Sequence, residues 1–419
     1  MRISALTTIV ALAVASPAGA ATDPYIDRQW GLARIGAPEA WSVGKGDGAT
    51  IAIVDTGVDR SHVDLKGNIV PGYDFVDGDS DPSDENGHGT HVAGIAAAVA
   101  GNGHGVAGVA PEAKIMPIRV LDADGYGYAS DIDEGVRWAV AHGADVVNMS
   151  LGDNVVVENL MGGTLADTVD YAWSKGVVPV ISAGNDEFFR TELRAAKTLL
   201  VTATTRTDAK ASYATSVGFA PWGIAAPGGD NSEGIEDTVF STYWSTSKPN
   251  AYGWGQGTSM AAPHVAGGAA VLRGLGLSPQ ATVDRLLDTA KDIGASGDDF
   301  TFGHGRVDVA AAIAGLKKPS VDAPKVGSKN EGTTDDDNND TASDGRSNEP
   351  RATADGDEAE PSSKPAADAQ LSPSPSPPVR AAVADEPDGS NAVPYVFFGG
   401  LFATATGALI ALRRLRMAR

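Results

Sequence analysis

Short apolar runs that alternate with helix-like segments restrict the possible folds of this chain more than any other feature. Helical patterns lie between most of the runs, at 130–142 and 164–175. Continuous apolar strands that alternate with helices predict a mostly parallel sheet covered on both faces, so the expected fold class is α/β. The runs are TIAIV (50–54), KIMPIRVL (114–121), DVVNMSL (145–151), VVPVIS (177–182) and LLVTATT (199–205).

Residues suited to chemistry follow three of these runs. Asp55 comes directly after the first run, Gly152 after the third, and Asn185 shortly after the fourth. The carboxyl ends of parallel strands share one edge of a sheet, and functional side chains collect there. We therefore expect a site along this edge.

Two further segments place a histidine and a serine at the starts of predicted helices. His88 lies in ENGHGTHVAGIAAAVAG, and Ser259 lies in QGTSMAAPHVAGGAAVLRGLG. A serine hydroxyl is a weak nucleophile until a base takes its proton, and a histidine oriented by a carboxylate such as Asp55 does this. The side-chain amide of Asn185 and the N–H of Ser259 are candidate donors to an oxyanion.

These residues also have structural interpretations. A serine before a helix is commonly a cap, and Pro263 is tolerated near a helix start. The DTG sequence at Asp55 also occurs in aspartic proteases, but those enzymes need two carboxylates and the chain has no second copy. His88 and His91 have a spacing that suits metal ligands, yet the segment lacks the glutamate of H-E-x-x-H. His91 and His264 are more simply interpreted as packed structural residues.

The order Asp, His, Ser, with the motifs VDTGVD, NGHGTHVAG, SAGND and GTSMAAPHVAG, resembles the subtilisin-like serine proteases over nearly all of 25–316. The resemblance implies a three-layer fold with a mostly parallel central sheet flanked by helices. It implies Asp55 as the orienting acid, His88 as general base and then acid, Ser259 as nucleophile, and Asn185 as oxyanion donor. The expected activity is that of a serine-type endopeptidase that forms an acyl-enzyme.

The same resemblance places the substrate peptide as an extra strand between SLG and the loop DADGYGYAS. Tyr126 either borders a pocket for an apolar side chain or packs at the surface. Asp186 lies next to Asn185, and its carboxylate is a candidate partner for a basic side chain of the substrate. The expected substrate-binding residues are Ser150, Leu151, Gly152, Gly125, Tyr126, Gly127, Ala183 and Gly184.

An acidic stretch before His88, GYDFVDGDSDPSDENG, resembles the calcium loop of thermitase-like subtilases. Alternate carboxylates suit a hard cation such as Ca²⁺, and the alternative is a solvated acidic loop. A second calcium site is expected at Asp64 and Asn102. The expected ligands in the acidic stretch are Asp74, Asp77, Asp79 and Asp81.

The ends of the chain differ from the predicted peptidase domain (21–316). Residues 1–20 have the pattern of a signal peptide, and 317–391 form an acidic linker rich in Pro and Ser that we expect to be disordered. Residues 392–412 carry no charge and are long enough for a transmembrane helix, and the arginines of 413–419 should stay cytoplasmic. This predicts an exported, membrane-tethered catalytic domain, although cleavage of the tail as a sorting signal is an alternative.

Composition narrows the function classes further. The chain has no cysteine and a formal net charge of −22, which exclude disulfide stabilisation and argue against nucleic acid as a partner. We expect a monomeric catalytic domain that acts on protein or peptide substrates, and the interval from Ala20 to Asp55 is too short for a prodomain. The alternatives are a narrow-specificity processing protease resembling mycosins and an inactive surface binding protein on the same scaffold.

Overall fold

The computed structural model describes residues 22–151, 155–156, 164–186 and 191–318. The predicted signal peptide, the apolar segment 392–412, the basic tail and the linker beyond 318 lie outside these ranges. Among the described residues, no helix is both long and apolar enough to cross a membrane.

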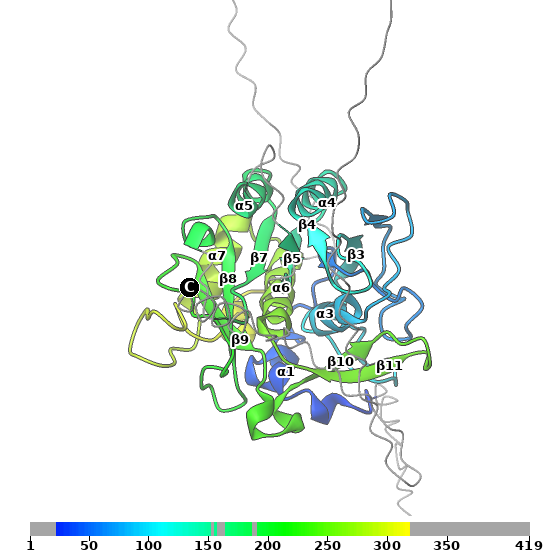
Figure 1. The fold of residues 1–419 in the computed structure, drawn as a ribbon. Coiled ribbons are helices and arrows are strands. Elements are labelled where there is room, and N and C mark those ends of the chain that lie inside the picture. Colours follow the sequence, from blue (N-terminus) through cyan, green and yellow to red (C-terminus); the bar gives the residue numbers. More distant parts are fainter. Residues whose placement is uncertain (1–21, 152–154, 157–163, 187–190, 319–419) are drawn as a thin grey trace, which may run out of the picture. The chain divides into compact units, whose positions relative to one another are not determined.

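A parallel sheet forms the centre of the domain (Figure 1). Within the described ranges it has seven strands in the order β2-β3-β1-β5-β7-β8-β9, and each neighbouring pair is parallel. The five apolar runs predicted from the sequence form five of these strands, so the α/β prediction is confirmed. The strands are β1 (Thr50–Asp55), β2 (Tyr73–Asp74), β3 (Lys114–Arg119), β5 (Val146–Met149), β7 (Val178–Ser182), β8 (Leu199–Thr204) and β9 (Gly223–Pro227).

Both faces of the sheet are buried, which explains why its strands are apolar throughout. Along β1, Ile51 and Ile53 pack into one hydrophobic core, whereas Ala52 and Val54 pack into a second core on the opposite face. Successive side chains of a strand point to opposite faces, so a strand between two helical layers needs apolar residues at every position.

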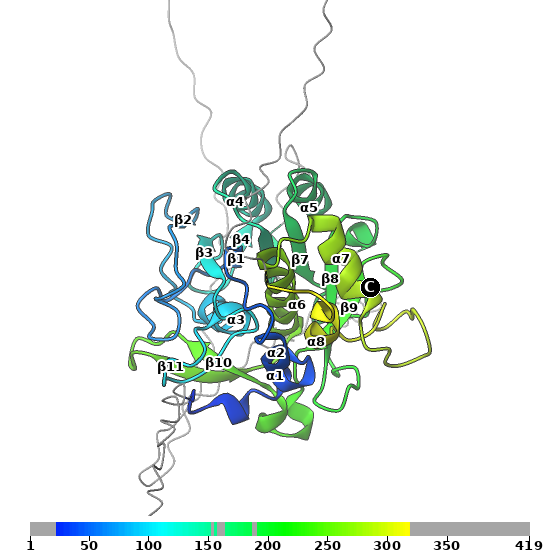
Figure 2. The same ribbon diagram turned by 180° about the vertical axis from the view of Figure 1, so that it is seen from behind.

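Helices cover the two faces. The first core includes residues of α3 and α6, and the second includes residues of α4 and α5. In Figures 1 and 2, α4 and α5 lie at the top of the view, and α3 and α1 lie lower. The helices are α1 (Trp30–Arg34), α2 (Ala37–Ala40), α3 (His88–Ala97), α4 (Ala129–Ala141), α5 (Leu165–Ser174), α6 (Thr258–Gly274), α7 (Pro279–Asp288) and α8 (Val309–Ile313), with 3-10 turns at Ile26–Arg28, Thr191–Arg194, Asn231–Glu233 and Ile235–Asp237.

Two small strand pairs lie outside the main sheet and were not predicted. β10 (Val239–Tyr243) and β11 (Ala251–Gly255) form an antiparallel hairpin, in which Ser241 donates a hydrogen bond to the backbone of α3 at His91 O, 2.9 Å away. β4 (Gly127–Tyr128) pairs in parallel with β6 (Val155–Val156). The hairpin therefore holds α3 against the domain from the side opposite the sheet.

Helix α6 is buried from Thr258 to Leu272 and crosses the face of the sheet. Small residues allow this. A Cβ at Gly267 would lie 2.6 Å from the Cβ of Val109 and 3.0 Å from the carbonyl oxygen of Ala96. The backbone of α6 therefore packs directly against these neighbours, with no room for a side chain. At Gly268 the nearest atom would be Cγ2 of Val309, at 3.2 Å.

These two adjacent glycines give a matched test of the packing. Alanine gains about 1 kcal/mol over glycine in a helix, but overpacking costs about 1–3 kcal/mol. In a Ser259→Ala background that prevents self-cleavage, we expect Gly267→Ala to melt about 3 °C or more below Gly268→Ala by calorimetry. Equal melting temperatures for the two variants would contradict the close contact.

Candidate active site

A buried carboxylate and an imidazole form the centre of the candidate site. Asp55 ends β1 with no exposed surface, and its Oδ1 lies 2.6 Å from Nδ1 of His88. The same oxygen accepts a hydrogen bond from the backbone N–H of Thr56, at 2.8 Å. Because a neutral imidazole that donates from Nδ1 carries its lone pair on Nε2, this contact makes Nε2 the basic atom of His88.

Glycines bring the start of α3 close to the end of β1. His88 is the first residue of α3, and Gly87 before it has a φ of 109°, a backbone conformation that favours glycine. A Cβ at Gly89 would lie 2.1 Å from the carbonyl oxygen of Gly57. The two backbones therefore meet at a distance that only glycine permits, and this places His88 beside Asp55.

The environment of His88 favours its charged form. Burial disfavours the imidazolium, but the charge and hydrogen bond of Asp55 outweigh burial, so the pKa of His88 is raised above its ordinary value of 6.5. A base with this environment is suited to take a proton during a reaction.

Ser259 lies in the first turn of α6 and is locked to the sheet by Ser150. The hydroxyl of Ser150 donates to the carbonyl oxygen of Ser259 at 2.8 Å, and the hydroxyl of Ser259 donates to the carbonyl oxygen of Ser150 at 3.3 Å. In an α-helix the carbonyl of residue 259 would accept from the N–H of residue 263, which is a proline and has none. Ser150 supplies the missing donor. The proline therefore leaves the carbonyl of Ser259 free to bond to Ser150, which directly follows β5.

The first turns of α3 and α6 both pack against Gly255, at the end of β11. A Cβ at Gly255 would lie 3.1 Å from Cε1 of His91 and 3.5 Å from Sδ of Met260. These two side chains belong to the turns that carry His88 and Ser259. The four predicted residues Asp55, His88, Asn185 and Ser259 thus lie at the carboxyl ends of strands or at the helix starts that face them.

Asn185 is oriented by the residue before Ser259. Its Oδ1 accepts the backbone N–H of Thr258 at 2.8 Å and the hydroxyl of Thr258 at 3.0 Å. Both hydrogen bonds are accepted by the amide oxygen of Asn185. Its Nδ2 group therefore remains available to donate to a substrate oxygen. The backbone N–H of Ser259 has no acceptor within the helix because it lies in the first turn. Sequence reasoning had not assigned this role to Thr258, although it lies inside the GTSM motif.

The described residues predicted to bind substrate lie in three segments. Leu151 is fully buried after β5, and Ala183 and Gly184 follow β7. In the loop after β3, Asp122 accepts the backbone N–H groups of Asp124 and Tyr126, and Gly127 begins β4. Gly152 lies outside the described residues. The binding of a peptide strand between these segments stays a prediction.

The two tyrosines of this loop are exposed rather than packed: Tyr126 has 53% and Tyr128 has 48% of its surface accessible. Gly125, between them and Asp122, has a φ of 82°, which favours glycine in this turn. The loop therefore presents aromatic side chains to solvent.

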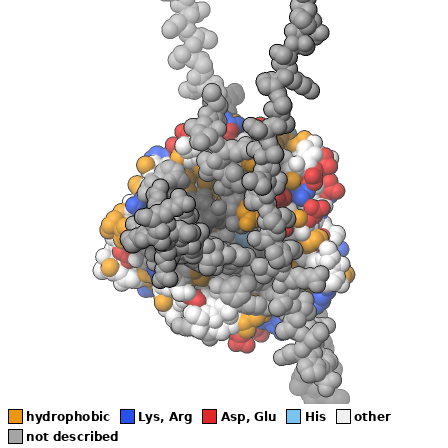
Figure 3. Space-filling model, viewed as in Figure 1, with side chains coloured by type: hydrophobic (Ala, Val, Ile, Leu, Met, Phe, Trp, Pro, Cys, Tyr) orange, Lys and Arg blue, Asp and Glu red, His pale blue; other side chains and the backbone are white. Residues whose placement is uncertain are grey.

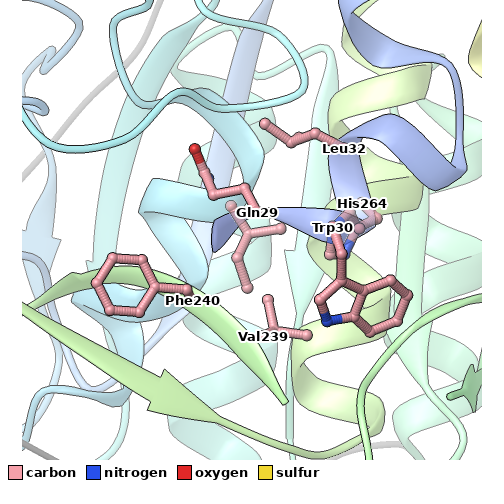
Figure 4. Close-up of a pocket in the computed structure, with 8 residues that line it drawn as sticks. Gln29, Trp30, Leu32, Val239, Phe240 and His264 are labelled. Carbon is pink, nitrogen blue, oxygen red and sulfur yellow. The ribbon is translucent and has the colours of Figure 1, made fainter. Parts of the chain in front are cut away.

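The other histidines near α3 and α6 are structural. His91 Nε2 contacts the carbonyl oxygen of Gly253 at 3.2 Å, and His264 Nδ1 contacts that of Met260 at 2.8 Å. Burial lowers the pKa of His91 to about 3 and that of His264 to about 4, so both rings stay neutral near pH 7. Figure 4 shows His264 beside Trp30 at a cavity of about 10 Å³, which has room for about one water molecule.

The acidic loop before α3 forms ion pairs with an arginine of β3. Buried Arg119, at the end of β3, donates to Asp74 at 2.7 Å and to Asp77 and Glu85 at 2.8 Å. Figure 3 shows acidic side chains gathered at the right edge of the face, where this loop lies. In the described residues no group of three acidic or histidine side chains has metal-binding geometry.

Calcium binding by Asp74, Asp77, Asp79 and Asp81 stays a prediction. The carboxylate of Asp79 accepts the backbone N–H of Asp81, and Asp81 forms an ion pair with Arg60. The guanidinium group of Arg119 offsets part of the charge of Asp74 and Asp77.

Asp64 and Asn102 form a hydrogen-bonded cluster with Asp23. Asp64 is fully buried and accepts Nδ2 of Asn102 at 2.9 Å, while Asp23 accepts the backbone N–H of Asn102 at 3.2 Å. Burial raises the pKa of Asp23, and the charge of Asp64 raises it further. Among the described ion pairs, no Lys or Arg neutralises either carboxylate. Sequence reasoning missed Asp23, which lies far from the two others in the chain.

Comparisons with known proteins agree with this geometry. Residues 46–305 match the model of the subtilase family. The chain is 41% identical over 294 residues to thermitase from Thermoactinomyces vulgaris, covering 70% of this chain and 98% of that protein. It is 40% identical over 284 residues to a thermophilic serine proteinase from a Bacillus species, covering 67% and 66%, respectively.

Solved structures also match. A protease from Pseudoalteromonas arctica aligns with a TM-score of 0.62 at 36% identity, covering 71% of this chain and 99% of that chain. Fervidolysin from Fervidobacterium pennivorans aligns with a TM-score of 0.58 at 30% identity, covering 73% and 48%.

Proposed function

The chain belongs to the subtilase family and is a serine-type endopeptidase, and from this premise we propose that Asp55, His88 and Ser259 carry out the reaction on an exported enzyme. The observation that carries the assignment is the 2.6 Å contact between Asp55 and Nδ1 of His88. Ser259 in the first turn of α6 adds the nucleophile, and Asn185, which contacts Thr258 in that turn, adds an oxyanion donor.

In the proposed mechanism, Nε2 of His88 takes the proton of Ser259 Oγ while this oxygen attacks the carbonyl carbon of the substrate. The oxygen of the tetrahedral intermediate accepts hydrogen bonds from the N–H of Ser259 and from Nδ2 of Asn185. His88 then gives the proton to the leaving amine nitrogen, and Asp55 stabilises the imidazolium throughout. Water enters in place of the amine, and the same steps in reverse order release the acid product.

A serine-directed fluorophosphonate probe tests this assignment. With the purified protein, we expect covalent labelling at Ser259 and cleavage of a peptide library, and both should be lost in Ser259→Ala. The matched control Ser150→Ala removes a neighbouring hydroxyl that is not the nucleophile and should still be labelled. Labelling of another residue, or cleavage by folded Ser259→Ala, would contradict the assignment. The library pattern also distinguishes broad from narrow specificity.

We also propose that the catalytic domain faces outward and is tethered through residues 392–412. The support is the sequence itself: a leader-like start, an uncharged stretch long enough to span a membrane, and trailing arginines. Applied to intact cells, a membrane-impermeant form of the same probe should label the enzyme in the membrane fraction. Labelling only after lysis would contradict an outward orientation, and release of the labelled enzyme to the medium would contradict retention by the tether.

Calcium is proposed at Asp23, Asp64 and Asn102. Two buried carboxylates without a cationic partner among the described residues suit a hard cation, and carboxylate and amide oxygens are its usual ligands. Bound there, the ion would supply positive charge and link the segment before α1 to the loop after α3. This role is structural and separate from the reaction.

Removal of calcium should therefore destabilise the fold. At a calcium concentration about 100-fold above its Kd, binding contributes about 2.7 kcal/mol, so chelation should lower the melting temperature by about 5 °C or more. Calorimetry of Ser259→Ala with and without chelator measures this. In the variant Asp64→Asn the chelator effect should be much smaller, whereas Asp77→Asn should keep it. An unchanged melting temperature in chelator would exclude the proposed site.

A further inference from the structure

Asp84 is a buried carboxylate close to the site that the reaction steps above do not use. It lies in the loop before α3 with 2% of its surface exposed. Among the described ion pairs it has no Lys or Arg partner, in contrast to Asp74 and Asp77 in the same acidic stretch. A buried charge without a counter-ion has to be stabilised by hydrogen bonds, and its partners show what it holds in place.

Five donors surround this carboxylate. Its Oδ1 accepts the hydroxyl of Thr56 and the backbone N–H groups of Asn86 and Gly87, each at 2.9 Å. Its Oδ2 accepts the backbone N–H of Thr90 at 2.9 Å and the hydroxyl of Thr90 at 2.5 Å. Because all five groups donate to it, the arrangement fits the ionised carboxylate, which only accepts hydrogen bonds.

These donors come from both sides of the pair formed by Asp55 and His88. Thr56 follows Asp55 directly, and Gly87 precedes His88 directly. Thr56 also donates its backbone N–H to Asp55 at 2.8 Å and accepts the N–H of Gly89 at its hydroxyl, at 2.9 Å. A continuous series of hydrogen bonds therefore runs from the carboxylate of Asp55 through Thr56 and Asp84 to the backbone that carries His88.

Asp84 also contributes charge. Burial opposes the imidazolium of His88, Asp55 favours it most strongly, and the charge of Asp84 favours it further. The remaining titratable group on the same helix, His91, is neutral near pH 7 because burial lowers its pKa to about 3. Among the described groups, Asp55 in contact with His88 and Asp84 on the preceding loop favour the imidazolium, although burial raises the pKa of Asp84 itself. Tyr243 of β10, which donates to the carbonyl oxygen of Asn86, stays neutral because burial raises its pKa to about 12.

We propose that Asp84 is a positioning residue of the protease: its carboxylate fixes the end of β1 relative to the start of α3, so that His88 stays aligned with Asp55 and in the field of a second negative charge. The inference rests on the proposed role of His88 as the base. It predicts two separable effects, one from the geometry and one from the charge.

The variant Asp84→Asn tests both effects through the pH dependence of kcat/KM. Loss of the charge should move the acidic midpoint, where His88 loses its proton, downward by about half a pH unit. Loss of alignment should lower kcat about 10-fold or more with KM nearly unchanged, because misplacement of a reacting group affects the transition state most. Thr56→Val removes only the connecting hydroxyl, so it should lower kcat and leave the midpoint where it is.

Asp299→Asn is the matched control. Asp299 is also buried and its Oδ1 accepts the backbone N–H groups of Thr301 and Phe302, at 2.7 and 2.8 Å, in a loop without a described contact to the site. This variant should lower the melting temperature and leave kcat and the midpoint unchanged. If Asp84→Asn does not fold, Thr56→Val still tests the alignment.

Two outcomes would overturn the proposal: wild-type kcat and midpoint in folded Asp84→Asn, or equal changes in Asp299→Asn. Wild-type kcat in Thr56→Val would overturn the alignment part. Failure of the proposed function would be distinguished by the wild-type enzyme, which would then lack Ser259 labelling or an acidic midpoint. If the wild-type enzyme shows both and the Asp84 variant is unaffected, only this inference fails.

Discussion

The carboxylate of Asp55 has no exposed surface, and the need to stabilise a charge removed from water shapes the whole site. A buried carboxylate costs several kcal/mol unless charge and hydrogen bonds offset the loss of hydration. The N–H of Thr56 and Nδ1 of His88 do this, at 2.8 and 2.6 Å. For the imidazole to come so close, α3 has to begin against the end of β1, and Gly89 leaves room for the two backbones to meet. The stabilisation of one buried charge thus also orients the base.

Helix α6 meets a related constraint through its proline. Pro263 leaves the carbonyl of Ser259 without its helical donor, and Ser150 provides a hydroxyl instead, 2.8 Å away. One residue earlier, Thr258 fixes the amide of Asn185 by two hydrogen bonds. The helix start is therefore connected to two neighbouring strands, β5 and β7, by side chains that flank the nucleophile. Local helix-capping preferences explain the residue types, and these cross-connections explain their positions.

The sequence predicted the strands well because both faces of the sheet are buried, so the apolar runs are continuous. Asp55, His88, Asn185 and Ser259 follow those runs or begin helices, and their predicted roles rest on the motifs that resemble subtilisin-like proteases. Contacts across long sequence separations could not be predicted from spacing. Arg119 lies 45 residues from Asp74, and spacing alone does not indicate the hydrogen bond between them. Asp23 likewise joins Asp64 only through the fold. The hairpin of β10 and β11 was missed because its strands are short and mixed in polarity.

Among the histidines of α3 and α6, the site raises the basicity of His88 alone. Titration of the imidazole resonances of the Ser259→Ala protein by NMR tests this most directly, because His91 and His264 serve as internal references. We expect a midpoint for His88 above 6.5, while His91 and His264 remain neutral down to a pH of about 4. A midpoint for His88 at or below 6.5, or protonation of His91 or His264 near pH 6, would contradict it.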